Sequence, residues 1–118
     1  KRKVLLNKSS DTNLWKFCGG KIETFDTDLA TTCLREAKEE MGVELELDAR
    51  EPYLFYTSKQ TEKGKADIIL VHYLANRKGE ITAGSDVREW AWFPIDRLEE
   101  KDLAPNIKPA LKHFGFLE

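Results

Sequence analysis

The sequence predicts an α/β domain in which a mixed β-sheet is sandwiched between helices. Two observations carry this prediction. Strand-like segments occur before and after an amphipathic helix expected at 28–41, and a second helix is expected near the end of the chain. The segment 67–75, DIILVHYLA, is a nearly continuous apolar run with the length and β-branching of a strand buried on both faces. This order of elements favours a sheet covered by helices.

Composition restricts the classes of protein to which the chain can belong. Its 118 residues, 41% of them hydrophobic, suffice for one domain with a sizeable core and are too few for two ordinary domains. The formal net charge is −2, so we expect no general binding to nucleic acid or to anionic membranes. No apolar run approaches the roughly 18 residues of a membrane span, and the basic start turns polar too early for a signal peptide. We therefore expect one cytoplasmic domain over 1–118.

The first elements of the chain are expected to be short. A strand is expected to end at 4–6, where Val and two Leu residues follow a basic start, and a turn is expected at 9–13. A short strand at 14–17 is then expected to run into a pair of glycines, and another at 21–23 to leave it.

The helix expected at 28–41 has recognisable ends. Asp26, Thr27 and Asp28 offer oxygen atoms that can cap its first amides. Gly42 is a residue type that commonly follows the last helical turn. At roughly 100° per residue, one apolar stripe must face the core, and it contains Ala30, Cys33, Leu34, Ala37 and Met41.

Three carboxylates, Glu36, Glu39 and Glu40, form a second stripe on this helix. Because like charges this close repel one another, the stripe favours a bound cation or a basic neighbour. The alternative is a solvated helix face, since Glu, Lys and Arg favour helices and 34% of the chain is charged. The Gly19–Gly20 pair favours a cation, because glycines let backbone atoms approach a ligand and hard divalent cations bind carboxylate and carbonyl oxygens.

The remaining elements follow from alternation, aromatic content and proline positions. Apolar and acidic residues alternate after the helix, and a later aromatic strand halts at Pro94. Pro105 is a good first-turn residue for a closing helix, and Pro109 is expected to kink that helix or delay its start. We expect strands at 43–47, 53–58, 67–75, 80–82 and 89–93, a helical turn at 96–101 and a helix from about 105 to 114.

Cysteine and histidine residues suggest no metal site. Cys18 and Cys33 lack metal-ligand spacing, and free thiols are expected, with a disulfide between them as the less favoured alternative. His72 is expected to be packed and hydrogen-bonded rather than a ligand-binding residue.

The segment 35–43, REAKEEMGV, resembles the second half of the Nudix hydrolase motif G-x5-E-x7-R-E-U-x-E-E-x-G-U, in which U is aliphatic. The first half fits less well. Thr27 stands where the family has glutamate, and Gly20 lies one position too far upstream. Either the loop has gained a residue, or Asp26 or Asp28 supplies the missing acid.

The resemblance extends over most of the chain and sharpens the predicted fold to the α/β/α sandwich of Nudix proteins, with the first strand truncated. It implies hydrolysis of a pyrophosphate linkage in a nucleoside diphosphate linked to another moiety, with Mg²⁺ or Mn²⁺ as cofactor. A MutT-like substrate, a nucleoside triphosphate or related nucleotide, is preferred because residues typical of ADP-ribose and dinucleoside polyphosphate hydrolases are not matched. The alternative is a Nudix-fold module that senses a nucleotide or binds a protein without turnover. Its support is the altered loop, in which Cys18 replaces the usual proline.

The resemblance also implies site residues. Four glutamates would do the catalytic work and hold the metal together with the carbonyl of Gly19: Glu36, Glu39, Glu40 and Glu89. A surface position is the alternative for Glu89. Lys21 and Arg35 would contact substrate, although Arg35 is better placed to brace the carboxylates, since it lies four residues before Glu39. Homodimers are common among relatives and are a possible assembly here.

Overall fold

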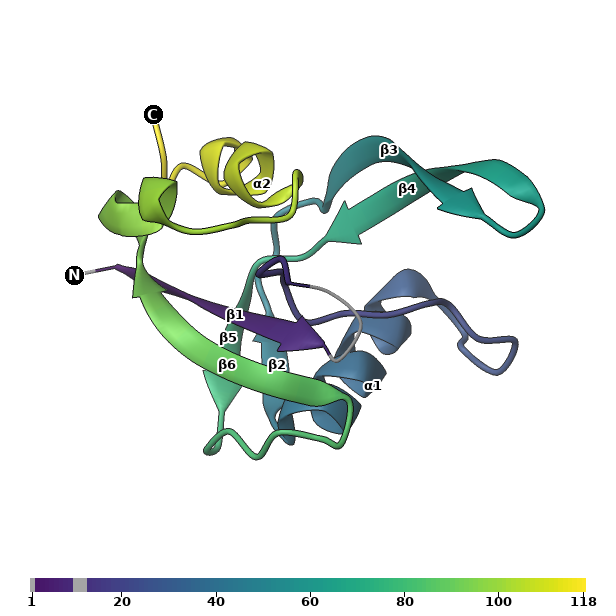
Figure 1. The fold of residues 1–118 in the computed structure, drawn as a ribbon. Helices are drawn as coiled ribbons and strands as arrows, with labels where there is room; N and C mark the ends of the chain where they lie inside the picture. Colours follow the sequence, from purple (N-terminus) through teal and green to yellow (C-terminus); the bar gives the residue numbers. More distant parts are fainter. Residues whose placement is uncertain (1, 10–12) are drawn as a thin grey trace.

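The structure, a computed structural model, describes residues 2–9 and 13–118. The turn predicted at 9–13 therefore lies largely outside the described residues. The elements follow one another as β1 (Lys3–Ser9), α1 (Leu29–Met41), β2 (Glu44–Leu47), β3 (Tyr53–Thr61), β4 (Gly64–His72), β5 (Ala75–Lys78), β6 (Val87–Pro94), the 3-10 helix η1 (Ile95–Glu100) and α2 (Ile107–His113) (Figure 1).

The described strands pair antiparallel, β1 with β6, β2 with β5 and β3 with β4. A parallel bridge joins Trp15 to Leu103, and an antiparallel bridge joins Asn7 to Lys16. The second bridge means that β1 has a neighbour on both edges, β6 on one side and the Lys16 segment on the other. β1 is therefore an interior strand.

The two faces of β1 pack against different helices. Leu6 is fully buried in a cluster with residues of η1 and α2, namely Ile95, Leu98, Ile107 and Leu111. Its neighbour Leu5 packs against a cluster formed by Ala37 and Met41 of α1 and by Val43. Because successive side chains of a strand point to opposite faces, β1 lies between α1 and α2. This arrangement confirms the predicted sandwich.

The helix predicted at 28–41 is confirmed by α1 and its caps. The side chain of Asp28 accepts a hydrogen bond from the backbone N–H of Thr31 at 2.7 Å. Gly42 adopts a left-handed conformation with φ of 65° and donates its N–H to the carbonyl of Lys38 at 3.0 Å. Both termini are thus closed by the residue types that favour them.

The prediction of a central strand at 67–75 is wrong. The run breaks at 73–74, so that its first part belongs to β4 and its end begins β5. β4 pairs with β3 in a hairpin that extends from the body of the protein (Figure 1), and Ile69 is 53% exposed. An apolar run does not by itself show which other elements cover its faces. In this structure β1, and not β4, is the strand that is covered on both faces.

Other differences concern short segments. Within the described residues, the segments 21–23 and 80–82 are not strands, and 14–17 is reduced to the two isolated bridges. The loop at 80–82, where a strand was expected, is held against the end of α1 by Thr82, whose N–H donates to the carbonyl of Met41 at 2.7 Å. The strands predicted at 43–47, 53–58 and 89–93 are confirmed by β2, β3 and β6, and the closing helix begins at Ile107 with Pro109 inside its first turn.

His72 is packed and hydrogen-bonded, as predicted. Its Nδ1 lies 3.1 Å from the carbonyl oxygen of Tyr53, and its Nε2 lies 2.8 Å from the side-chain nitrogen of Asn106. Cys18 and Cys33 are both free thiols.

Candidate active site

A pocket of about 440 Å³ lies beside the acidic stripe of α1. Its walls come from β1, from the loop that contains Gly19 and Gly20 (the glycine loop), from α1 and from the loop that enters β6. The lining residues are Asn7, Ser9, Lys16, Gly20, Lys21, Glu36, Glu40, Asp86 and Val87. The structure therefore brings three carboxylates and two lysines to one cavity, although they lie far apart in the sequence.

Glu36 and Glu40 reach the pocket because they lie one helical turn apart on the same face of α1, while Ala37 and Met41 anchor the helix in the core. The glycine loop closes over both carboxylates. The N–H of Gly19 donates to Glu40 Oε1 at 3.2 Å. A Cβ atom at Gly20 would overlap the carboxylate of Glu36, so a side chain at this position would have to displace that carboxylate.

The electrostatics of the pocket follow from this closeness. Burial raises the pKa of Glu40, and the negative charge of Glu36 adds to the rise, while the N–H of Gly19 opposes it. Burial, reinforced by the Glu40 carboxylate, also raises the pKa of the Cys18 thiol far above its ordinary value. Cys18 thus stays protonated and packs as a small apolar residue against the cluster beneath α1.

Arg35 lies at the centre of an ion-pair network. Its guanidinium donates two hydrogen bonds to the carboxylate of Asp26, from Nε to Oδ1 at 3.1 Å and from Nη2 to Oδ2 at 3.0 Å. Nη1 also lies 3.1 Å from Glu39 and 3.3 Å from Glu36, and Nη2 donates to the carbonyl of Lys21 at 3.0 Å. Arg35 therefore braces the loop and the carboxylates, as its spacing to Glu39 suggested.

Asp26 is the acid that pairs with this arginine. Its side chain is 1% exposed, and the hydrogen bonds from Arg35 lower its pKa to about 2. Asp28 caps α1 instead. Of the alternatives that the sequence left open for the missing glutamate, the structure supports substitution by Asp26.

The sequence-predicted residues are only partly brought together. Glu36, Glu40 and Lys21 line the pocket, and Gly19 adjoins it through Glu40. Glu39 is not among the lining residues that the structure describes; its side chain is 58% exposed and pairs with Arg35.

The prediction that Glu89 completes the site is not supported by its position. Glu89 lies opposite Lys8 in the register of β1 and β6, and their side chains form an ion pair of 3.8 Å. Lys8 and Leu6 point to the same face of β1, the face that packs on α2. Glu89 thus lies on the face turned away from the pocket.

Sequence reasoning missed Asn7, Lys16 and Asp86. Asp86 precedes β6 in a loop held against α1 by the N–H of Gly84, which donates to the carbonyl of Glu40 at 2.7 Å. A signal for Asp86 existed, because it is the acid that enters the aromatic strand once β6 is recognised to begin at Val87. Asn7 and Lys16 carry no such signal.

The residues present fit a divalent cation in their chemistry. Glu36, Glu40 and Asp86 supply carboxylate oxygens, the ligands that Mg²⁺ prefers, and a cation would offset the repulsion that helps raise the pKa of Glu40. Across the described part of the chain, no three His, Cys, Asp or Glu side chains converge as a ready-made metal site. Glu36 lines the pocket but also forms an ion pair with Arg35, in which Oε2 lies 3.3 Å from Nη1.

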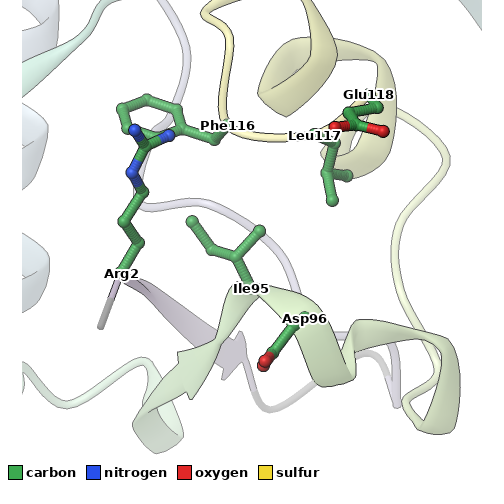
Figure 2. A pocket seen from close by; sticks show the side chains of 6 residues that line it. All are labelled: Arg2, Ile95, Asp96, Phe116, Leu117 and Glu118. Atoms are coloured by element: carbon green, nitrogen blue, oxygen red, sulfur yellow. The ribbon is translucent and has the colours of Figure 1, made fainter.

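A second pocket, of about 390 Å³, lies where the two ends of the described chain meet (Figure 2). It is lined by Arg2, Ile95, Asp96, Phe116, Leu117 and Glu118. Arg2 lies over the ring of Phe116, with 5.2 Å from the guanidinium carbon to the ring centroid. This pocket shares no lining residue with the first and contains no residue of α1, so it is not the candidate active site.

The fold recurs in solved structures of other proteins. The E. coli ORF135 protein is 26% identical, with a TM-score of 0.65 over 95% of this chain and 79% of that chain. The NUDIX domain of Shewanella oneidensis NrtR, solved with ADP ribose, is 24% identical, with a TM-score of 0.70 over 95% and 77%. A C. elegans Ap4A hydrolase is 16% identical, with a TM-score of 0.75 over 95% and 82%. No curated protein matches the sequence.

Among the helices of the described residues, none has the length and apolar character of a membrane span.

The family model of the NUDIX domain matches residues 1–114, nearly the whole chain. With the acidic helix, the glycine loop and the arginine that braces them in place, the chain belongs to the Nudix family and is a Nudix pyrophosphohydrolase.

Proposed function

We propose that this protein hydrolyses a pyrophosphate linkage in a nucleoside triphosphate or a related nucleotide, with Mg²⁺ or Mn²⁺ as cofactor. The observation that carries the proposal is that carboxylates and lysines line one pocket. A phosphoric anhydride resists water because its negative charges repel a nucleophile. A divalent cation, when bound, neutralises that charge and lowers the pKa of a bound water.

The residues of the pocket divide these tasks. Glu36, Glu40 and Asp86 would hold the cation, with Glu39 and the carbonyl of Gly19 as the further ligands proposed from the family motif. Lys16 and Lys21 line the same pocket and would attract the phosphate oxygens, because an ammonium group is a compact positive charge. Arg35 acts indirectly by holding Glu36 and Glu39.

The test is an activity panel with one informative variant. Nucleoside triphosphates, nucleotide sugars, ADP-ribose, NADH and dinucleoside polyphosphates are incubated with the protein in Mg²⁺ or in EDTA, and released phosphate products are measured. Cleavage is expected only with the metal, and Glu40→Gln is expected to lower kcat by roughly 10²-fold or more. Glu39→Gln is expected to act in the same direction.

The matched control is Glu46→Gln, which removes an exposed carboxylate of β2 and should leave turnover unchanged. If no substrate is cleaved but a nucleotide binds saturably, the protein is a binding module. If no divalent cation binds at millimolar concentration, the acidic stripe of α1 is a surface feature and the proposal fails.

We also infer a cytoplasmic location. Its support is that Cys18 and Cys33 are free, as thiols generally are in a reducing compartment.

A further inference from the structure

Asn7 has an environment that the fold alone does not explain. Its residue is 1% exposed, and neither Nδ2 nor Oδ1 has a hydrogen-bond partner. The other buried polar side chains among the described residues are satisfied: Thr32 donates to Asp26 at 3.0 Å, and Asn106 bonds to His72 at 2.8 Å. An unpartnered buried amide costs free energy, because it has given up its hydrogen bonds to water.

The position of this amide is fixed by the backbone. The N–H of Asn7 donates to the carbonyl of Lys16, and the N–H of Lys16 donates to the carbonyl of Asn7, both at 2.9 Å. On its other edge Asn7 pairs with Trp90 of β6. The backbone of Asn7 is thus held on both edges. Because Leu6 points toward the cluster beneath α2, the side chain of Asn7 points to the other face of β1, where it lines the pocket beside Glu36 and Glu40 (the carboxylate pocket).

The remaining lining residues indicate what the amide binds. The described lining contains Ser9, Lys16 and Lys21 and no aromatic ring, and Val87 is its one aliphatic residue. Such walls offer little surface on which a nucleobase could stack, whereas the lysines and the amide donor suit phosphate oxygens. The pocket therefore fits the phosphate chain of a nucleotide.

We propose that Asn7 is a substrate-binding residue whose Nδ2 donates a hydrogen bond to an oxygen of the nucleotide's phosphate chain, while Oδ1 accepts one from a water in the same pocket. The assignment rests on the proposed function. The neutrality of the amide matters, because Glu36, Glu40 and Asp86 already line this cavity. A donor without charge binds phosphate there and leaves the carboxylates free to attract a cation.

The experiment compares two buried asparagines. Asn7→Leu replaces an unpartnered amide with an apolar side chain of the same branching and heavy-atom count. Asn106→Leu makes the same replacement where the amide has a hydrogen-bond partner. Two quantities are measured for each: the thermal unfolding temperature without ligand or metal, and the affinity for imidodiphosphate in Mg²⁺ by calorimetry. This probe is a pyrophosphate analogue that is not hydrolysed.

For Asn7→Leu we expect an unfolding temperature equal to or above that of the wild type, with imidodiphosphate affinity lower by about tenfold or more. For Asn106→Leu we expect the reverse, a lower unfolding temperature with unchanged affinity. Asn7→Asp keeps the shape but replaces the donor with a fourth carboxylate, and it should bind the probe even more weakly. This variant provides the same test if Asn7→Leu does not fold.

The outcomes separate this proposal from the proposed function. If the wild type cleaves nucleotides and Asn7→Leu has unchanged KM and unchanged probe affinity, the role of Asn7 is refuted while the hydrolase stands. If the wild type cleaves nothing, yet binds imidodiphosphate through Asn7, the proposed function fails and the phosphate site stands. A loss of unfolding temperature without loss of affinity would make Asn7 a purely structural residue.

Discussion

Gly19 and Gly20 are neighbours in the sequence but have different surroundings. A Cβ atom at Gly20 would overlap the Glu36 carboxylate, whereas a Cβ at Gly19 would meet no atom within 4 Å. Gly20→Ala should therefore displace Glu36 and lower kcat/KM by about 10²-fold, since small misplacements of a reacting group are costly. Gly19→Ala keeps the backbone N–H that bonds Glu40 and the backbone carbonyl proposed as a ligand, so it is the matched control and should retain activity. Equal loss in the two variants would show that loop flexibility, and not the contact with Glu36, is what matters.

The pairing of Asp26 with Arg35 predicts a dependence of stability on pH. The pKa of Asp26 is about 2 in the folded protein, below the 3.8 of an ordinary aspartate. The pair therefore stabilises the fold above pH 3.8, and this contribution is lost as the pH falls through 2. The free energy of unfolding, measured in urea for the wild type and Asp26→Asn, should differ most near neutrality. A difference that stays constant down to pH 2 would contradict the assignment.

At this scale the sequence predicted some contacts and missed others for physical reasons. The carboxylate stripe followed from helical periodicity, because Glu36 and Glu40 are one turn apart. Glu89 was misplaced because a one-residue choice of register decides which face of a strand a side chain occupies. Asn7 could not be foreseen, since its significance depends on the absence of partners among residues distant in sequence.

The N-terminus of α1 depends on one side chain at the scale of the element. Asp28 accepts the N–H of Thr31 at 2.7 Å, so Asp28→Ala should lower the free energy of unfolding, because a first-turn amide loses its acceptor. Asp28→Asn retains an acceptor and should recover most of that loss. Urea unfolding of the three proteins measures both effects, and an unchanged midpoint for the alanine variant would show that the cap contributes nothing.

The contact between β4 and α2 depends on a neutral histidine. Nδ1 of His72 donates to the carbonyl of Tyr53, so Nε2 is left to accept a hydrogen bond from the Asn106 amide. Burial lowers the pKa of His72 below its ordinary 6.5. The neutral side chain therefore stabilises the fold above pH 6.5, and the contribution declines as the pH falls toward the lowered pKa. Thermal unfolding of the wild type and His72→Gln should converge between pH 7.5 and 5, and parallel curves would argue against it.

Elements were easier to predict than their surroundings. The ends of α1 and the start of η1 follow from local residue types, which need no knowledge of the rest of the chain. The strand at 67–75 was misjudged because its apolar residues lie on a hairpin, where Tyr56 is 69% exposed and Ile69 53%. Only the course of the whole chain decides which strand has neighbours on both edges.

For the whole molecule, the difference between β1 and the β3–β4 hairpin predicts a gradient of local stability. β1 lies between two hydrophobic clusters, whereas the hairpin extends from the body (Figure 1). Amide hydrogen exchange should be slowest around Leu6 and fastest at the turn joining Thr61 to Gly64, because exposed hydrogen bonds open more readily. Equal protection in the two regions would show that another surface, such as a second copy of the chain, covers the hairpin.

Leu6 and Asn7 are consecutive residues of β1 that point to opposite sides, one to the core beneath α2 and the other to the pocket beside α1. The side chain at position 7 makes no hydrogen bond on which the rest of the fold depends. Ligand preference at this position is therefore separable from folding competence. A substitution at position 7 can therefore change what the pocket binds while Leu6 keeps its place in the core, so binding can change on an unaltered scaffold.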